Sequence, residues 1–163
     1  MSKDHEYTVC FLFDSALENV LLVRKARTRF KGRLNGVGGE VNTTAEAPAE
    51  CAVREIREET GIKYSGLKSL GLTRLAFLGT LLLPDDCKYQ DGNGCVLHYY
   101  AGAMKPGTSY TKTTDTGEEL VLEPVADILE ATVDNVRYAG DGDLQYFVNA
   151  GLNALRRYLP GKE

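Results

Sequence analysis

Histidine and paired cysteines are scarce in this chain of 163 residues, and its 19 basic residues are outnumbered by 23 acidic ones. The formal net charge is −4 and the pI is near 5.3, which argues against general affinity for nucleic acid, since such affinity favours a basic surface. Two histidines give little material for a zinc site, and none of the four cysteines stands in a C-x-x-C pair. We therefore expect reduced cysteines in a cytoplasmic protein, without a disulfide framework.

Membrane and nucleotide-loop signatures are missing as well. No apolar run approaches the length of a membrane span, and the first eight residues do not resemble a signal peptide. The fingerprints G-x-G-x-x-G and G-x-x-x-x-G-K-[ST] are absent, which excludes the usual dinucleotide-binding and P-loop sites. With 43% hydrophobic residues and no internal repeat, the chain can bury one core, so we expect a single domain over residues 1–163.

What the chain does have is a crowd of carboxylates. Five glutamates fall within fourteen residues: Glu46, Glu50, Glu55, Glu58 and Glu59. The last three are spaced i, i+3 and i+4, so they share one face of a helix. Two carboxylates about 4 Å apart repel by roughly 4 kcal/mol at an effective dielectric near 20. A purely structural helix gains nothing from this repulsion, whereas a site for divalent cations needs it.

Local signals define the helix that carries these glutamates. Pro48 suits a first helical turn, and Gly61 suits a left-handed C-terminal cap. An apolar stripe at helical spacing is expected to face the core: Ala49, Ala52, Val53, Ile56 and Thr60. Thr43 and Glu46 also match a capping box, but that start would put Pro48 about four residues inside the helix. We therefore predict that the helix starts at Pro48.

A glycine-rich turn precedes this helix. Asn35 to Glu40 reads Asn-Gly-Val-Gly-Gly-Glu and leads into a polar loop, Val41 to Ala45. Glycine lets the backbone approach a ligand closely and adopt positive φ. Alone, such a cluster is typical of a plain tight turn. Because it leads straight into an acidic helix, we interpret the turn and the helix as parts of one site.

The stretch from Gly39 to Ile62 resembles the signature box of the Nudix hydrolases. That box is a glycine, five residues, a glutamate, seven residues, then Arg-Glu, an aliphatic residue, any residue, Glu-Glu, any residue, glycine and an aliphatic residue. The following positions match in register: Glu46, Arg54, Glu55, Ile56, Glu58, Glu59, Gly61 and Ile62. Six residues, not five, separate Gly39 from Glu46. We expect this insertion to leave the helix register intact and to alter how the Gly39 carbonyl reaches a metal.

The resemblance implies roles for these residues. Mg²⁺, with Mn²⁺ as a possible substitute, would bind the substrate's phosphates and activate the water that cleaves a phosphoanhydride bond. The expected ligands from the box are Glu55, Glu58, Glu59 and the carbonyl of Gly39. Glu55, Glu58 and Arg54 are the candidate catalytic residues, with Glu55 a ligand or the residue that orients the nucleophile and Arg54 orienting the glutamates. Glu46, off the main acidic arc, would have a supporting role.

A further acid on a distant loop serves many family members as base or extra ligand. Glu118 and Glu119 are the candidates here, and Glu119 is assigned as the fifth metal ligand, although spacing does not choose between them. The alternative for either is an exposed loop acid.

Substrate contacts are predicted from a narrower resemblance. In the family's oxidised-purine nucleoside triphosphatases, an asparagine at the position of Asn35 contacts the base, and late acids before the C-terminal helix also read the purine. Asp143 matches one such acid, with Asp141 nearby. Two alternatives stay open: Asn35 as a turn residue, and Asp143 as the N-cap of the last helix. Arg24, in a basic stretch that runs to Arg33, is the candidate phosphate contact.

Features of two other subfamilies are missing. ADP-ribose hydrolases would have a proline some fifteen residues past the box, and diadenosine polyphosphate hydrolases a tyrosine slightly further. Neither stands between Phe77 and Thr80.

The rest of the chain predicts strands and one more long helix. Tyr7–Phe13 and Asn19–Arg24 are expected to form a hairpin, and strand signals recur later in the chain. The later elements are strand segments within Leu67–Leu83, strands at Cys95–Met104 and Leu120–Leu122, a helical turn at Val125–Leu129 and a helix over Asp143–Leu159. Strands with two separated helices predict a mixed sheet sandwiched between helices, an α/β fold of the α+β kind, as in the Nudix fold.

The function predicted from the sequence is Mg²⁺-dependent hydrolysis of a nucleoside diphosphate-linked compound. A nucleoside triphosphate pyrophosphohydrolase, with an oxidised purine as one possible substrate, is the specific form. The alternative is a non-catalytic Nudix-fold module that binds a nucleotide to regulate another activity. Such modules typically lose box glutamates, and this chain keeps all of them. The expected partner is a nucleotide, without nucleic acid or membrane, bound by a monomer or a homodimer.

Overall fold

A mixed β-sheet runs through the computed structural model, which describes residues 5–27, 30–64, 72–83 and 94–157. Its strands are β1 (His5–Phe13), β2 (Asn19–Arg24), β3 (Leu34–Asn35), β4 (Leu72–Leu83), β5 (Cys95–Met104) and β6 (Leu120–Pro124). The strand order is β3-β2-β1-β5-β4, and β6 also pairs with β2. β1 and β5 are parallel, and the other pairs are antiparallel. The predicted mixed sheet is confirmed.

The predicted hairpin is confirmed, with β1 starting two residues earlier than expected. Asp14 stabilises its turn, because its Oδ1 accepts the Glu18 N–H at 2.8 Å and its Oδ2 accepts the Asn19 side-chain amide at 2.7 Å. An aspartate that bonds the backbone ahead of it is a common means of fixing a turn.

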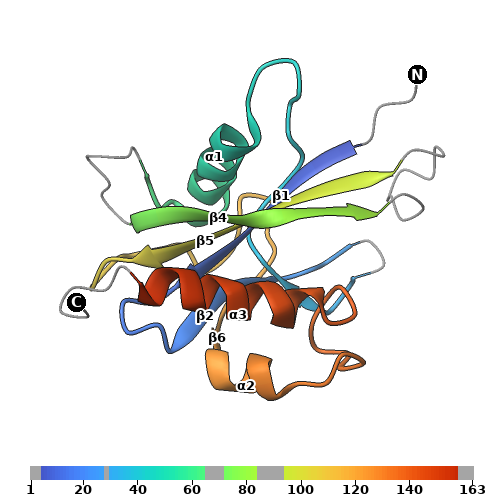
Figure 1. Cartoon of the computed structure of the whole chain (residues 1–163). Helices are drawn as coiled ribbons and strands as arrows, with labels where there is room; N and C mark the ends of the chain where they lie inside the picture. Colours follow the sequence, from blue (N-terminus) through green and yellow to red (C-terminus); the bar gives the residue numbers. More distant parts are fainter. Residues whose placement is uncertain (1–4, 28–29, 65–71, 84–93, 158–163) are drawn as a thin grey trace.

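Helices cover both faces of the sheet (Figure 1). α1 (Pro48–Thr60) lies over one face, and α2 (Val125–Glu130) and α3 (Asp143–Arg156) lie over the other. Because side chains alternate along a strand, β1 supplies both cores. Phe11 and Phe13 pack with α2 and α3, and Cys10 and Leu12 pack with α1. The expected sandwich of a sheet between helices is the observed architecture.

The later elements match the predictions, with adjusted ends. The strand predicted at Leu120–Leu122 extends to Pro124, and the helical turn expected after it is α2. The strand at Cys95–Met104 is confirmed. Residues 67–71, most of the connection expected at Pro84–Gly94, and the last two residues of the expected C-terminal helix lie outside the described residues.

One alternative from the sequence is wrong. The N-cap of α3 is Gly142, and Asp143 is the first residue inside the helix. The chain reaches that helix through a run of three residues with positive φ, Gly140, Asp141 and Gly142, so the capping position falls one residue earlier than the polar side chain.

Candidate functional site

α1 begins and ends where the sequence predicts. Its first residue is Pro48, and Gly61 at its C-terminus has a φ of 80° and donates its N–H to the Arg57 carbonyl at 2.8 Å. Glu50 accepts the N–H of Ala47 at 3.0 Å, which satisfies one of the donors that a helix N-terminus leaves without a partner. The glutamates are therefore held in one helical register, as the Nudix resemblance requires.

The buried face of α1 differs from the predicted stripe at two positions. Ala49 is exposed and Val53 is half-buried, whereas Cys51 is fully buried. Cys51 is buried because the glycine-rich segment that precedes the helix packs against it. The Cys51 Sγ lies 3.4 Å from Thr8 Oγ1 and donates to the carbonyl of Glu40 at 3.5 Å. Cys51 is thus a small residue of the buried face, packed between the sheet and the glycine-rich segment.

The glycine-rich segment, residues 35–40, lies directly against the acidic helix. The turn predicted for it is wrong, because the segment runs beside β1 through the bridges Cys10–Val37 and Tyr7–Glu40. Gly38 donates its N–H to Glu59 Oε2 at 3.0 Å, and the Gly39 carbonyl accepts the Thr8 N–H at 2.9 Å. A Cβ at position 38 would collide with the carbonyl of Thr8, and a Cβ at position 39 with the carboxylate of Glu55. Glycine is needed at position 38 because the Thr8 backbone approaches so closely, whereas at position 39 the Glu55 side chain would have to move. The glycine-rich segment and the acidic helix therefore pack together and form one site.

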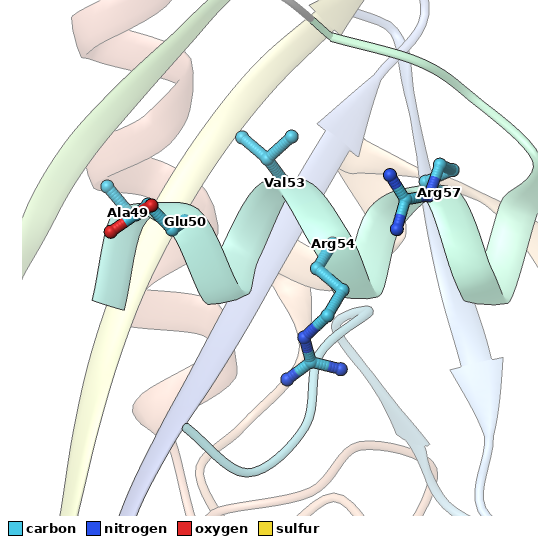
Figure 2. Close-up of a pocket in the computed structure, with 5 residues that line it drawn as sticks. All are labelled: Ala49, Glu50, Val53, Arg54 and Arg57. Atoms are coloured by element: carbon cyan, nitrogen blue, oxygen red, sulfur yellow. The ribbon is translucent and has the colours of Figure 1, made fainter. Parts of the chain in front are cut away.

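Arg54 connects three of the box glutamates. Its guanidinium binds both oxygens of Glu46, at 3.0 Å from Nε and 2.7 Å from Nη2. Its Nη1 donates to Glu55 at 2.8 Å and to Glu58 at 3.1 Å. Figure 2 shows Arg54 leaving α1 in the opposite direction from Val53. Arg54 thus holds the three glutamates by direct hydrogen bonds, while its catalytic role and the supporting role of Glu46 stay predictions.

The carboxyl groups of the box have unequal environments. The hydrogen bond from Arg54 lowers the pKa of Glu46 to about 2. Burial raises the pKa of Glu59 to about 8, and the charges of Glu55 and Asp115 act in the same direction, while the Gly38 N–H and Lys25 oppose them. Burial also raises the pKa of Glu55, against the opposing charge of Arg54. Burial and clustering thus leave negative charge at Glu55 and Glu59 without full compensation.

These donors suit a hard divalent cation. Carboxylate and carbonyl oxygens are the ligands that Mg²⁺ prefers, and a cation would favour the ionised form of Glu59, whose pKa is raised by burial and, to a lesser extent, by neighbouring charge. Among the described residues, no three acidic, histidine or cysteine side chains converge on one cation position, because Glu55 and Glu58 turn toward Arg54 and Glu59 toward Gly38. Arg54 Nη1 bonds one oxygen of Glu55 and one of Glu58, and the donor set as a whole fits the ion.

The two loop acids expected as distal ligands are held by cations of the basic stretch. Glu119 is 61% exposed and pairs with Arg24 at 3.2 Å. Glu118 is 12% exposed, accepts the Ala26 N–H at 2.7 Å and lies 3.6 Å from Lys25 Nζ. Both side chains are drawn toward the strand end at Arg24.

Asp115 is the acid that sequence reasoning missed. Its charge contributes to the raised pKa values of both Glu55 and Glu59, so it lies within electrostatic range of the acidic face. It stands at the tip of the turn Thr114–Gly117, which Thr114 closes by accepting the Gly117 N–H at 3.0 Å. A Thr-Asp-Thr-Gly sequence predicts a turn, but nothing in its spacing indicates that the turn faces α1.

The expected substrate residues lie on neighbouring segments, since Arg24 is the register partner of Leu34, which precedes Asn35. Leu34 and Tyr138 form a parallel bridge, so Asn35 lies beside the segment that leads to Asp143. Asn35 Oδ1 accepts the N–H of Gly36 at 2.8 Å, and Asn35 is the last residue of β3 rather than a turn residue. Asp143 is half-buried, and burial followed by the charge of Asp141 raises its pKa. Arg24 binds Glu119 and the Gly32 carbonyl, at 3.2 Å and 3.3 Å.

Aromatic rings lie next to Asp143. Tyr99 and Phe147 stack with centroids 3.6 Å apart and planes 4° from parallel, and Tyr146 meets Phe147 edge-on at 5.0 Å. Burial raises the pKa of Tyr99, and the charge of Asp143 adds to this. Tyr146 is 70% exposed. The polar end of α3 is therefore bordered by apolar ring surface.

Two open depressions lie away from the three central glutamates. One, of about 410 Å³, follows α1 and is lined by Ala49, Glu50, Val53, Arg54 and Arg57 (Figure 2). The other, of about 510 Å³, is bordered by the β1–β2 turn, α2 and α3. The first touches the acidic cluster through Arg54.

Comparison with known proteins gives the family context. The NUDIX domain model matches residues 3–139. The NUDIX domain of Shewanella oneidensis NrtR, solved with ADP ribose, is similar with a TM-score of 0.69 and 16% identity, over 95% of this chain and 90% of that one. A MutT protein from the work on Aliivibrio salmonicida and Vibrio cholerae has a TM-score of 0.63 and 17% identity, over 91% and 98%.

A further neighbour places the NUDIX domain in a longer chain. NrtR of Shewanella oneidensis, solved with a 27mer DNA, is similar with a TM-score of 0.64 and 17% identity, over 93% of this chain but 62% of that one. None of the described helices is long and apolar enough to cross a membrane. The cytoplasmic location and the single-domain organisation stay predictions.

Proposed function

The chain belongs to the Nudix family of hydrolases, and from that premise we propose that it is a Mg²⁺-dependent nucleoside triphosphate pyrophosphohydrolase. Its products would be a nucleoside monophosphate and pyrophosphate. The observation that carries the proposal is that the glycine-rich segment packs against the acidic helix. Gly38, Glu55 and Glu59 form one surface whose negative charge is incompletely compensated. Such a surface favours a divalent cation and the phosphates bound to it.

The box residues divide the work. When bound, Mg²⁺ or Mn²⁺ supplies charge neutralisation for the polyphosphate and acidifies a coordinated water. Glu55, Glu58, Glu59 and the Gly39 carbonyl would hold the ion, with Glu55 either a ligand or the residue that orients the attacking water. Arg54 keeps the glutamates in place through its bonds to Glu46, Glu55 and Glu58. Outer residues of this kind often matter as much as the ligands that they orient.

A distal acid completes the proposed site. We assign Asp115 to it ahead of Glu119, the residue favoured by the sequence. Asp115 affects the pKa values of Glu55 and Glu59, whereas Glu119 pairs with Arg24 on an exposed surface. Lys25, whose charge lowers the pKa of Glu59, is proposed as a phosphate contact in preference to Arg24.

Asn35 and Asp143 are the proposed readers of the base. Their segments pair through Leu34 and Tyr138, and side chains of these two types can bond a purine edge. The Asn35 amide can both donate and accept hydrogen bonds, and the Asp143 carboxylate can accept them. An oxidised purine, whose edge carries both donors and acceptors, is therefore the proposed base.

Regulation through nucleotide binding is the second candidate function. The Shewanella NrtR structure with ADP ribose favours it, because that domain and this chain share a fold. The full set of box glutamates favours hydrolysis. ADP ribose therefore belongs in the same assay, as a ligand and as a substrate.

A nucleotide panel tests the proposal. Normal and oxidised triphosphates, ADP ribose and dinucleoside polyphosphates are incubated with Mg²⁺, and the products are identified. We expect triphosphates to yield pyrophosphate, chelation to stop the reaction, and Glu58→Gln to reduce turnover severely. Glu130→Gln, at an exposed glutamate that ends α2, is the matched control. Absence of turnover, or a fully active Glu58→Gln variant, would refute the hydrolase proposal, and tight ADP ribose binding without turnover would favour the regulator.

A further inference from the structure

Arg137 links strand β6 to the segment beside Asn35. Its guanidinium donates to both oxygens of Glu123, from Nε at 2.6 Å and from Nη2 at 3.1 Å. The Glu123 side chain is 5% exposed, whereas that of Arg137 is 47% exposed. A bidentate pair fixes orientation as well as distance, so the backbone at residue 137 is anchored to the sheet.

The anchored backbone pairs with β3. The Arg137 carbonyl accepts the Leu34 N–H at 2.8 Å, and the Leu34 carbonyl accepts the Ala139 N–H at 2.9 Å. β6 and β3 both pair with β2, so the Arg137–Glu123 pair closes a ring of contacts that runs through three strands. Asn35 follows Leu34 directly, so these contacts also fix the position of the Asn35 backbone.

From Ala139 the chain reaches Asp143 through a constrained turn. Gly140, Asp141 and Gly142 all have positive φ, of 85°, 49° and 103°, and Asp143 donates its N–H to the Gly140 carbonyl at 2.9 Å. A non-glycine residue in this conformation persists where its surroundings enforce it. The place of Asp143 relative to Asn35 therefore depends on where residues 137–139 are held.

We propose that Arg137 is a positioning residue that, through Glu123, sets the separation of Asn35 and Asp143. The inference rests on the proposed function, in which these two side chains contact the base. Arg137 itself is not required to touch the substrate. Because α1 covers the opposite face of the sheet from α3, loss of the pair should weaken base recognition and leave the acidic face in place.

Substitution of Arg137 tests this inference. Arg137→Met keeps roughly the length of the side chain and removes its charge. Arg137→Lys keeps the charge but cannot bind Glu123 through two nitrogens at once. Arg156→Gln, at an exposed arginine of α3, is the control. Glu123→Gln combined with Arg137→Met removes the buried charge too, in case the single variant is poorly folded. KM and kcat are measured for the best purine triphosphate and its pyrimidine counterpart, with amide hydrogen exchange at Leu34 and Ala139.

The expected result is selective. Arg137→Met should raise KM for the purine triphosphate about tenfold, the equivalent of one ordinary hydrogen bond. The values of kcat and of KM for the pyrimidine triphosphate should stay nearly unchanged. Hydrogen exchange at the Leu34 and Ala139 amides should become faster. Arg137→Lys should fall between Arg137→Met and the wild type. An unchanged purine KM, or a loss of kcat shared by both substrates, would overturn the positioning role while leaving hydrolysis intact. A wild-type protein that hydrolyses no nucleotide would instead overturn the proposed function.

Discussion

Gly38 donates its backbone N–H to a carboxylate oxygen of Glu59 across 3.0 Å, and Glu59 is only 8% exposed. This bond joins the glycine-rich segment to the last turn of the acidic helix. The segment is rich in glycine because it passes close to the carbonyl of Thr8 and the carboxylate of Glu55. The geometry of the acidic face thus depends on a backbone contact as well as on helical spacing.

Gly38→Ala should destabilise the fold and the site together. The added Cβ would collide with the Thr8 carbonyl, and relief of that overlap would pull the N–H away from Glu59. We expect a loss of about 2–3 kcal/mol in the free energy of unfolding, measured by urea denaturation. Gly107→Asn is the control, because nothing lies within 4 Å of an added Cβ there and asparagine tolerates positive φ. Equal stability of the two variants would contradict the close approach.

The raised pKa of Glu59 predicts a pH dependence of stability. Glu59 titrates near 8 in the folded protein and near 4.3 when unfolded, so between these values the folded state binds the proton more tightly. Its contribution is complete below about pH 4 and is lost as the pH rises through about 8. We expect the unfolding free energy to fall over this window less steeply in Glu59→Gln than in the wild type.

Denaturation curves at pH 5.5 and pH 8 test this difference, with Glu130→Gln as the control that should follow the wild type. Mg²⁺ should stabilise the wild type more at pH 8 than at pH 5.5, because the ion competes with the proton for the same carboxylates. A parallel pH dependence of Glu59→Gln and the wild type would show that burial does not raise the pKa of this carboxyl.

Arg54→Lys should weaken the site although the charge is conserved. Lysine cannot bind Glu46 through two parallel bonds and also reach Glu55 and Glu58, as Arg54 does. Loss of an orienting residue typically costs about 10–100-fold in metal affinity or activity. Steady-state kinetics over a Mg²⁺ titration measures both. Arg57→Lys, at an exposed arginine one turn along the same helix, should behave like the wild type, and an equally small effect at Arg54 would argue against its orienting role.

Asp115 and Glu119 can be separated by a pair of variants. Asp115→Asn should reduce kcat or Mg²⁺ affinity by at least about tenfold and lower the pKa of Glu59, because one of the charges that raises it is gone. Glu119→Gln should leave both nearly unchanged, since Glu119 pairs with Arg24 on an exposed surface and such pairs contribute little. The reverse result would return the distal role to the residue that the sequence favoured.

Local sequence signals were reliable where one segment decides its own structure. Pro48 and Gly61 defined α1, because a missing N–H and a free positive φ act within one helical turn. The hairpin of β1 and β2 was predictable for the same reason. The N-cap of α3 was not, because three consecutive residues with positive φ moved it to Gly142.

The buried face of α1 shows where such signals stop. Helical spacing predicts Ala49 on the buried apolar stripe. The structure instead buries Cys51, which contacts Thr8 and the glycine-rich segment. Asp115 is a similar case. Its electrostatic influence on Glu55 and Glu59 arises from a loop more than fifty residues away in the chain, and no local pattern encodes that proximity.

The sequence by itself determined the chemistry of the acidic helix: which residues are carboxylates, that Glu55, Glu58 and Glu59 lie close together along it, and that Arg54 stands among them. These properties follow from composition and from the 3.6-residue period of a helix. The tertiary structure decided how that charge is handled. It paired Glu46 with Arg54, buried Glu59 against Gly38 and brought Asp115 into range, because burial and long-range contact exist only once the sheet has brought distant segments together.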